Sequence, residues 1–279
     1  MDAGMTESKW KLVVDREGVT ITGDKFQLTA ANKAAADTDL LDAQPDVGMM
    51  DPAAIEGIIS ELQSINRRTY GQFCGLSHAA EMVGERWGML IIRDLLVGPK
   101  RFSELSEGLP LLSPDILSAR LKEMEHFGVL QAVPSATEEG VVRYELTEYG
   151  QELDHVMRDF GRWGARTLDT PRPEEIVTIN GLIMAMRSCF RGSAVSEVAM
   201  TFEMTVDTMV VHGAIGDGVM TVVEGPDAGA ALRVSPGAAT KDLLTGKSTG
   251  DSLRATEGFA YSGDDALLDD FARSFSLDR

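Results

Sequence analysis

Basic residues gather in one stretch of the chain, where their charge could neutralise the phosphates of nucleic acid. They are Lys100, Arg101, Arg120, Lys122 and Arg143. The whole chain carries a formal net charge of −18, which argues against non-specific coating of nucleic acid because like charges repel. A local basic surface is compatible with that charge, since acid elsewhere would penalise loose binding. These residues therefore predict a confined phosphate-binding site.

The segment from Ser113 to Gly128 predicts a helix with a signal at each end. Ser113 can cap the first backbone amides, Pro114 suits the first helical position, and Gly128 supplies the stop. Apolar residues at helical spacing predict one buried face: Leu117, Leu121 and Met124, flanked by Ile116 and Phe127. Small or polar residues on the other faces form a surface that could press into a groove: Asp115, Ser118, Ala119 and Lys122.

The neighbours of this helix predict a helix-turn-helix followed by a hairpin, the wing. The predicted elements are an apolar helix over Trp87–Leu96, a short helix over Phe102–Leu109 capped by Ser103 or another neighbour of Arg101, strands over Val129–Val133 and Val142–Leu146, and a helix from Thr147 to Trp163. Residues at the start of a recognition helix reach base edges, whereas nearby cations bind phosphates.

A DNA-binding surface follows from this arrangement. Its predicted residues are Lys100, Arg101, Ser113, Pro114, Asp115, Ser118, Ala119, Arg120, Lys122 and Arg143. Arg120 leaves two alternatives open, a bond to phosphate or guanine and an internal ion pair with Glu123 or with an acid of the first helix. Asp115 could equally serve the helix dipole, and we expect Arg143 to position the wing rather than read sequence.

Several motifs occur in one order along residues 70–169. They are Tyr70–Cys74, Gly84–Trp87, Leu96–Leu105, the Ser113–Glu125 helix and Tyr144–Gly150. This set resembles the HxlR-type family of bacterial winged helix-turn-helix regulators. The resemblance implies a homodimeric transcription regulator, which we expect to be a cytoplasmic repressor that associates with the nucleoid when bound to double-stranded DNA. This sequence departs from the family pattern at Gly75, where family members commonly have proline.

The cysteines are Cys74 and Cys189, too few for a disulfide framework, which indicates a reducing compartment. Some members of the resembled family sense electrophiles through a cysteine at the place of Cys74. Cys74 is therefore a candidate redox sensor, and the alternative is a buried thiol that only packs at a dimer interface. A reactive thiol needs nearby positive charge, which Arg67 and Arg68 could supply.

Pro171-Arg172-Pro173 predicts a domain boundary because proline cannot continue the preceding helix. We expect an N-terminal extension over residues 1–50, with a hairpin from 11–14 and 19–22 and then a linker. A winged helix-turn-helix domain for DNA binding and dimerisation covers residues 51–169 and opens with a helix over 52–65, and a second domain covers residues 174–279. The N-terminus has no basic flank before an apolar core, which predicts no secretory signal.

The second domain alternates strands and helices, which favours an α+β fold with a sheet layered against helices. We predict a helix over 174–190, strands over 199–206, 208–215, 218–223 and 231–234, and helices over 238–244 and 265–275. The motifs Val219–Val222, Ala231–Val234, Leu243–Gly246, Ala260–Asp264 and Leu267–Phe275 together resemble the sterol carrier protein family. That resemblance implies an apolar cavity able to take a lipid or another hydrophobic small molecule.

Candidate ligand-binding residues follow from the second resemblance and from the methionine-rich composition of this half, since thioethers adapt to varied apolar ligands. They are Met186, Phe190, Phe202, Met204 and Met220. The alternative is that these side chains only fill the core.

The histidines have no metal-ligand spacing and no nucleophile motif is present, so we expect no catalysis, metal or cofactor. The longest apolar run, Met89–Ile92, is too short for membrane insertion.

Two functions from different classes fit these observations. The first is a ligand-responsive transcription factor, and the second is a lipid-binding carrier whose winged domain serves mainly for dimerisation. Retardation of the chain's own upstream DNA separates them, because only the regulator would prefer that sequence.

Overall fold

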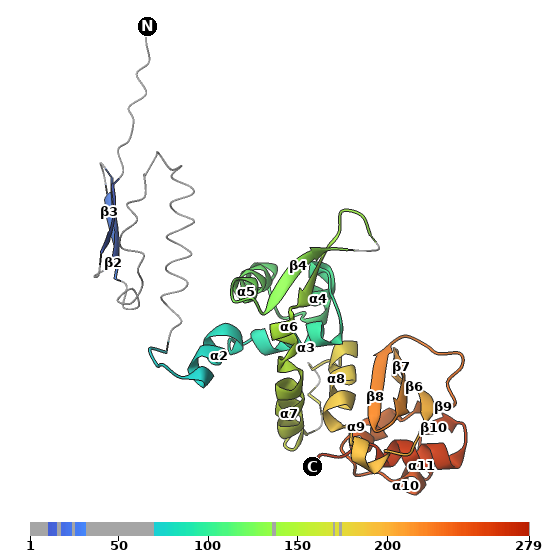
Figure 1. Cartoon of the computed structure of the whole chain (residues 1–279). Coiled ribbons are helices and arrows are strands. Elements are labelled where there is room, and N and C mark those ends of the chain that lie inside the picture. The colour runs from blue at the N-terminus through green and yellow to red at the C-terminus, as the bar shows by residue number, and fades with distance from the viewer. Residues whose placement is uncertain are drawn as a thin grey trace. The chain divides into compact units, whose positions relative to one another are not determined.

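The computed structural model describes residues 11–15, 18–23, 26–31, 70–135, 138–169, 171–172 and 175–278 (Figure 1). Contacts along the chain divide it into two units, Met1–Glu81 and Met82–Arg279. The predicted hairpin is present as β1 (Lys11–Asp15) and β2 (Gly18–Gly23), and β3 (Phe26–Ala31) extends it into an antiparallel sheet of order β1-β2-β3. The helix predicted over 52–65 lies outside the described residues.

The helix-turn-helix has the predicted order of elements. Helix α2 (Gly75–Val83) precedes α3 (Gly88–Val97), α4 (Phe102–Gly108) and α5 (Pro114–His126). The Ser113 hydroxyl accepts a hydrogen bond from the Ile116 amide at 3.4 Å, so the predicted cap is present. At α4 the capping group is Glu104 rather than Ser103, because its carboxylate reaches back to the Arg101 amide at 2.6 Å.

The wing is an antiparallel hairpin of β4 (Leu130–Pro134) and β5 (Val142–Leu146). Lys100 joins its edge through two backbone hydrogen bonds with Tyr144, at 2.9 and 2.8 Å. This bridge ties the turn between α3 and α4 to the wing. The helix predicted from Thr147 to Trp163 is two helices, α6 (Glu148–Gln151) and α7 (Leu153–Ala165).

A close backbone approach accompanies the start of this helical pair. The Thr147 hydroxyl accepts the Gly150 amide at 3.1 Å, as a cap should. A Cβ atom at Gly150 would lie 2.0 Å from the Val129 carbonyl oxygen. Glycine is therefore required here, because any side chain would push the first turn of α6 away from the strand β4 region.

The C-terminal half has a mixed sheet of order β10-β9-β6-β7-β8, in which only the β6–β9 pair is parallel among the described strands. Its elements are α8 (Ile179–Cys189), β6 (Met200–Val206), β7 (Met209–Gly216), β8 (Val219–Glu224), β9 (Leu232–Ser235), α9 (Thr240–Leu244), α10 (Gly250–Arg254), β10 (Ala260–Ser262) and α11 (Asp265–Arg273). The predicted α+β layering is present. Helix α8 begins later than predicted because Thr178 caps it, accepting the Gly181 amide at 3.1 Å.

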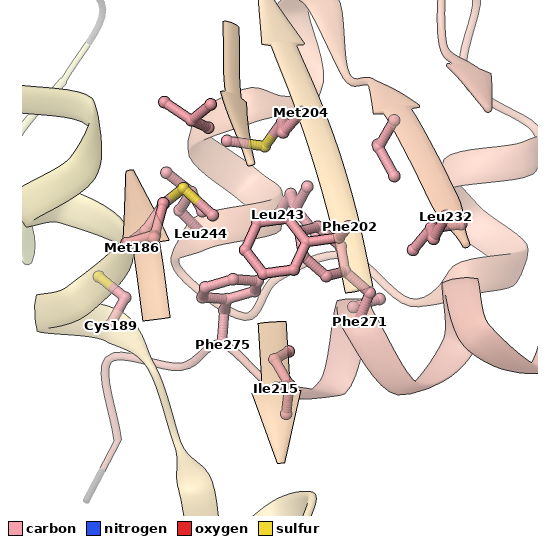
Figure 2. Packing of buried hydrophobic residues seen from close by; sticks show 14 of the residues in the cluster. Met186, Cys189, Phe202, Met204, Ile215, Leu232, Leu243, Leu244, Phe271 and Phe275 are labelled. Carbon is pink, nitrogen blue, oxygen red and sulfur yellow. The ribbon is translucent and has the colours of Figure 1, made fainter. Parts of the chain in front are cut away.

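The core of this half lies on one face of the sheet. Along β6 the buried residues alternate with more exposed ones: Met200, Phe202, Met204 and Val206 are buried. The ring of Phe202 packs on Phe271 of α11 with centroids 5.0 Å apart (Figure 2). This alternation is typical of a sheet that is covered by helices on one side only.

Helix α8 contacts both halves of the larger unit. It packs on α3 and α7 of the winged half and on β7, β8 and α9 of the C-terminal half (Figure 1). Buried residues occur all round it, and they include Asn180, Ile183, Met184, Met186 and Ser188. A helix that is buried all round belongs to a core. Within the described residues, no helix combines the length and apolarity needed to cross a membrane.

Candidate nucleic-acid interface

Helix α5 buries one face and exposes the opposite one. Leu117, Leu121 and Met124 are buried, as their spacing predicts. Asp115, Ala119 and Lys122 are exposed on the other side, with Ser118 half-buried beside them and Ser113 and Pro114 exposed at the start. Helix N-termini and one exposed helix face are what a major groove accommodates. Most of the predicted recognition surface is therefore accessible on one side of α5.

Two apolar residues next to this face are exposed, and the sequence did not mark them. Ile116, predicted to flank the buried face, is 45% exposed, and Leu111 in the turn before α5 is 83% exposed. Ile116 precedes Leu117 by one position, so it turns about 100° away from the centre of the buried face. Exposed apolar groups at such places can contact the thymine methyl group.

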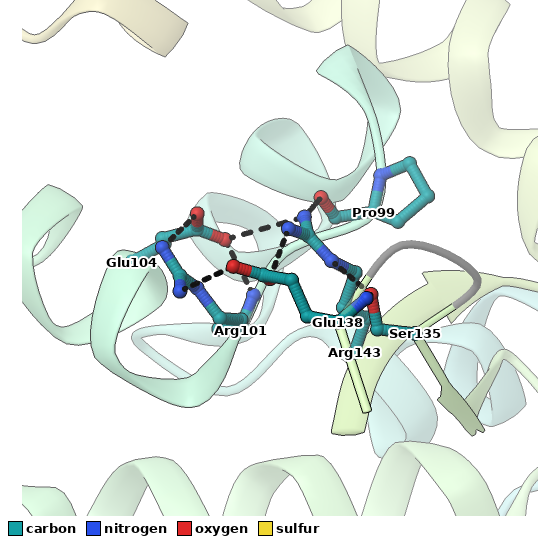
Figure 3. A network of polar contacts seen from close by, with 6 residues as sticks. All are labelled: Pro99, Arg101, Glu104, Ser135, Glu138 and Arg143. Atoms are coloured by element: carbon teal, nitrogen blue, oxygen red, sulfur yellow. Dashed lines mark hydrogen bonds and ion pairs between the residues drawn. The ribbon is translucent and has the colours of Figure 1, made fainter. Parts of the chain in front are cut away.

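Beside α5, four charged residues from α4 and the wing form a cluster, here named the wing cluster: Arg101, Glu104, Glu138 and Arg143 (Figure 3). Arg101 pairs with Glu104 at 3.1 Å and with Glu138 at 3.4 Å. Arg143 pairs with Glu138 at 3.1 Å and with Glu104 at 3.8 Å. Each arginine thus faces two carboxylates, and the cluster joins the start of α4 to the wing.

Further hydrogen bonds hold Arg143 and Glu104 in this cluster. Arg143 donates to the Ser135 hydroxyl at 3.4 Å and to the Pro99 carbonyl at 3.5 Å. Partial burial opposes ionisation of Glu104, but hydrogen bonds from the Arg101 amide and guanidinium and the charges of both arginines outweigh it and lower the pKa of Glu104. Glu104 therefore stays ionised in acid conditions that would protonate an ordinary glutamate.

For Arg120 the structure shows the second of the two alternatives, an internal ion pair. Its side chain is only 10% exposed and pairs with Glu123 at 2.5 Å and with Glu85 at 4.0 Å. The guanidinium lies on the buried side of α5, so it has an internal ion pair in place of a phosphate or guanine. We therefore leave Arg120 out of the proposed interface.

The two predicted lysines, Lys122 and Lys100, differ in solvent exposure and in the contacts they make. Lys122 is exposed on the face of α5 and makes no ion pair with any described residue. Lys100 is half-buried, and its backbone is held in the bridge to Tyr144. Lys122 is thus the most accessible of the predicted cations, whereas Arg101 and Arg143 are already paired.

Cys74 directly precedes α2 and is exposed. Hydrogen bonds from the backbone amides of Ser77 and Leu76, with a smaller contribution from the Ser77 hydroxyl, lower the pKa of the Cys74 thiol. By contrast, burial raises the pKa of the Cys189 thiol. Cys74 is thus exposed in the single chain, and its burial at a dimer interface stays a prediction. Arg67 and Arg68 lie outside the described residues.

The candidate ligand residues occupy two environments. Met186, Phe202 and Met204 are completely buried in the C-terminal core (Figure 2). Phe190 and Met220 are half-buried and pack against the same core from its edge. Over the part of the chain that the structure describes, no group of His, Cys, Asp or Glu side chains is arranged to hold a metal ion.

Comparison with known proteins assigns the winged half. Residues 82–171 match the model of the HxlR-like helix-turn-helix family. The chain is 34% identical over 113 residues to the HTH-type transcriptional regulator Rv3095 of Mycobacterium tuberculosis, which covers 40% of this chain and 68% of that protein. It is 36% identical over 88 residues to the HTH-type transcriptional regulator YodB of Bacillus subtilis, which covers 32% of this chain and 79% of YodB.

A solved structure resembles the same region. The crystal structure of quinone-bound YodB from Bacillus subtilis is 35% identical and covers 34% of this chain and 99% of that chain, with a TM-score of 0.29. The assignment therefore depends on the sequence matches, in which identity exceeds 30% over more than two thirds of each relative. On that evidence, the chain belongs to the HxlR-like helix-turn-helix family of transcriptional regulators.

Proposed function

We propose that this chain represses transcription as a homodimer that binds a specific DNA sequence and responds to a hydrophobic ligand. The exposed face of α5 carries the proposal: Asp115, Ala119 and Lys122 lie opposite the buried residues of that helix. The wing cluster lies on the neighbouring α4 and wing. Side chains on α5 would read bases, while Arg101 and Arg143 would bind phosphates.

A second copy of the chain would cover the apolar face of α7. Val156, Phe160 and Trp163 are all about half-exposed or more, and the last two rings stack with centroids 5.8 Å apart. No residue of α7 is buried, although the helix carries large apolar side chains. Exposed apolar groups gathered in this way mark interaction surfaces, and a twofold pair would bring the same face of both chains together.

The C-terminal half would influence DNA binding through α8. Arg187 of α8 donates to the Leu96 carbonyl in the last turn of α3 at 2.9 Å, and it also reaches the Val222 carbonyl of β8 at 3.3 Å. From α7, Arg162 donates to the Ser188 carbonyl at 2.7 Å. A shift of α8 would therefore disturb α3, which leads into the helix-turn-helix, and α7, the proposed dimer helix.

A buried carboxylate adds a third link between α8 and the winged half. Asp94 of α3 is fully buried and pairs with Arg93 at 2.7 Å, and Asn180 of α8 lies beside the same point at Gly108. A Cβ atom at Gly108, the last residue of α4, would lie 2.8 Å from a carboxylate oxygen of Asp94. The ends of α3, α4 and α8 thus meet at one polar centre, which makes their relative positions interdependent.

A ligand would have to open the C-terminal core. Met186 belongs to α8 and is completely buried in the same core cluster as Phe275 (Figure 2). Methionine side chains adapt their shape at low cost, so displacing Met186 is a direct way to move α8. By linkage, a ligand that prefers the displaced state lowers DNA affinity by the same factor as DNA lowers the affinity for the ligand.

The test is operator binding with and without a ligand probe. We would measure retention of a labelled duplex from the chain's own upstream region, against a scrambled duplex, with and without a saturating fluorescent fatty acid. We expect preference for the upstream duplex and a change in its affinity of roughly five- to 150-fold with the fatty acid. Fatty-acid binding without preference for either duplex would instead support a lipid carrier, the second function considered.

A further inference from the structure

The arginines of the wing cluster are neutralised within the chain before any DNA binds. We propose that Glu138 competes with DNA phosphate for Arg101 and Arg143, and that this competition weakens binding to DNA of unrelated sequence. The proposal deepens the DNA-binding function proposed above and rests on it. Its basis is the geometry of the cluster in Figure 3, where Glu138 lies between the two guanidinium groups.

Glu138 contacts each arginine with a different carboxylate oxygen. Oε1 lies 3.4 Å from Nη1 of Arg101, and Oε2 lies 3.1 Å from Nη2 of Arg143. A phosphate presents oxygens to guanidinium groups in the same way as a carboxylate does. Glu138 therefore occupies the donors that a DNA backbone would use, and a phosphate could bind both arginines only by displacing it.

The two carboxylates of the cluster differ in how firmly they are held. Glu104 belongs to α4, accepts the Arg101 amide at 2.6 Å and has a lowered pKa. Glu138 belongs to the wing loop, and its side chain is 41% exposed, against 30% for Glu104. Exposed ion pairs are weak and are exchanged readily. Glu104 is accordingly a structural partner, whereas Glu138 is the one that can leave.

Competition of this kind acts on every sequence alike. Phosphate contacts carry no base information, so an internal competitor for them lowers the sequence-independent part of affinity. Base contacts from α5 are untouched by Glu138. The affinity of the chain for DNA of any sequence is therefore lower than it would be with unpaired arginines, while the preference for an operator depends on α5.

The test compares Glu138→Gln with Glu139→Gln. Glu139 is the next residue, is exposed and forms no ion pair with a described residue, so both variants remove one negative charge from the same loop. We would measure affinity for the upstream and scrambled duplexes by fluorescence anisotropy. We expect Glu138→Gln to bind the scrambled duplex roughly three- to tenfold more tightly than wild type, and Glu139→Gln to differ from wild type by less than about twofold.

A second comparison shows whether the arginines mediate the gain. With Arg101→Gln and Arg143→Gln in the same chain, Glu138→Gln should no longer exceed Glu139→Gln on the scrambled duplex. An advantage that persists there, or a Glu138→Gln chain that binds no tighter than Glu139→Gln, overturns the proposal. Preference of wild type for the upstream duplex is read separately and tests the proposed function, whatever the Glu138 variants do.

Discussion

The guanidinium of Arg187 lies 2.9 Å from the carbonyl oxygen of Leu96, so a side chain of the C-terminal half binds the last turn of α3. This contact closes the end of a helix whose final carbonyls have no partner within the helix itself. The same guanidinium also reaches the sheet at Val222. Arg187 therefore links α8 by hydrogen bonds to both α3 and β8.

Replacing Arg187 with glutamine should destabilise the chain. Both carbonyl oxygens lose a charged donor in a partly buried place, and we expect a loss of about 1–3 kcal/mol in the free energy of unfolding. The matched control is Arg191, which is exposed and lies two residues after the end of α8. Arg191→Gln should stay within about 0.5 kcal/mol of wild type. Equal effects in urea unfolding would contradict the role given to Arg187.

Asp94 should make stability depend on pH. Burial, opposed by Arg93, raises the pKa of this carboxyl above its ordinary value of 3.8. The folded chain therefore binds a proton more tightly than the unfolded chain, and the stabilising contribution of protonated Asp94 is lost as pH rises through the raised pKa. Asp94→Asn should remove this component. Urea unfolding of both proteins from about pH 4 to pH 7 measures it, and parallel curves would exclude it.

The exposed face of α5 can be tested with one charge. Ala119→Glu adds bulk and a negative charge where the groove should lie, and we expect at least a roughly tenfold loss of affinity for the upstream duplex. Ala238→Glu makes the same change at an exposed residue of the C-terminal half and should bind like wild type. Thermal unfolding would confirm that both variants are folded. Undiminished binding by Ala119→Glu would remove α5 from the interface.

The stacked rings on α7 should hold the proposed dimer together. Trp163→Arg places a charge on the proposed contact, and we expect a shift toward monomer in sedimentation velocity. The control is Val223→Arg, which changes an apolar residue of β8 that is also exposed, at 47%. If Val223→Arg dissociates the protein and Trp163→Arg does not, the dimer forms through the sheet instead.

The two thiols should react very differently. Cys74 is exposed and has a lowered pKa, so its thiolate is populated below the ordinary thiol value of 9.0. Cys189 is buried with a raised pKa. Brief treatment with iodoacetamide at neutral pH should label Cys74 and leave Cys189 intact, as peptide mass spectrometry would show. Labelling of both cysteines at similar rates would contradict this. Loss of DNA binding after diamide, absent in Cys74→Ser, would extend the result to redox sensing.

Local signals in the sequence were enough to predict the start and end of α5. Ser113 caps the helix, and Gly128 takes a left-handed φ of +69° after it. Asp207 and Asp217, in the turns between strands, also take a left-handed φ, of 53° and 52°, which aspartate tolerates better than most residues. The backbone conformation at each of these positions depends on one or two residues, and the types of those residues can be read from the sequence.

Contacts between distant segments were harder to predict. Ile116 and Arg120 have helical spacings that fit either flank of α5, and only the packing of neighbouring elements decides which flank is covered. The position of α8 shows the same limit. Its apolar residues predicted a helix, but no local pattern indicated that Asn180 and Arg187 would face α3.

The double packing of α8 also bears on how this protein can be recombined. A cut between the two halves, before or after α8, would leave Asp94 and the Leu96 carbonyl open to solvent on one side, or the underside of the sheet on the other. A chimera that exchanges the C-terminal half for another must therefore bring a helix with an asparagine and an arginine at matching positions. The two halves therefore form one structural block, and a different C-terminal half cannot be joined to this winged half without such a helix.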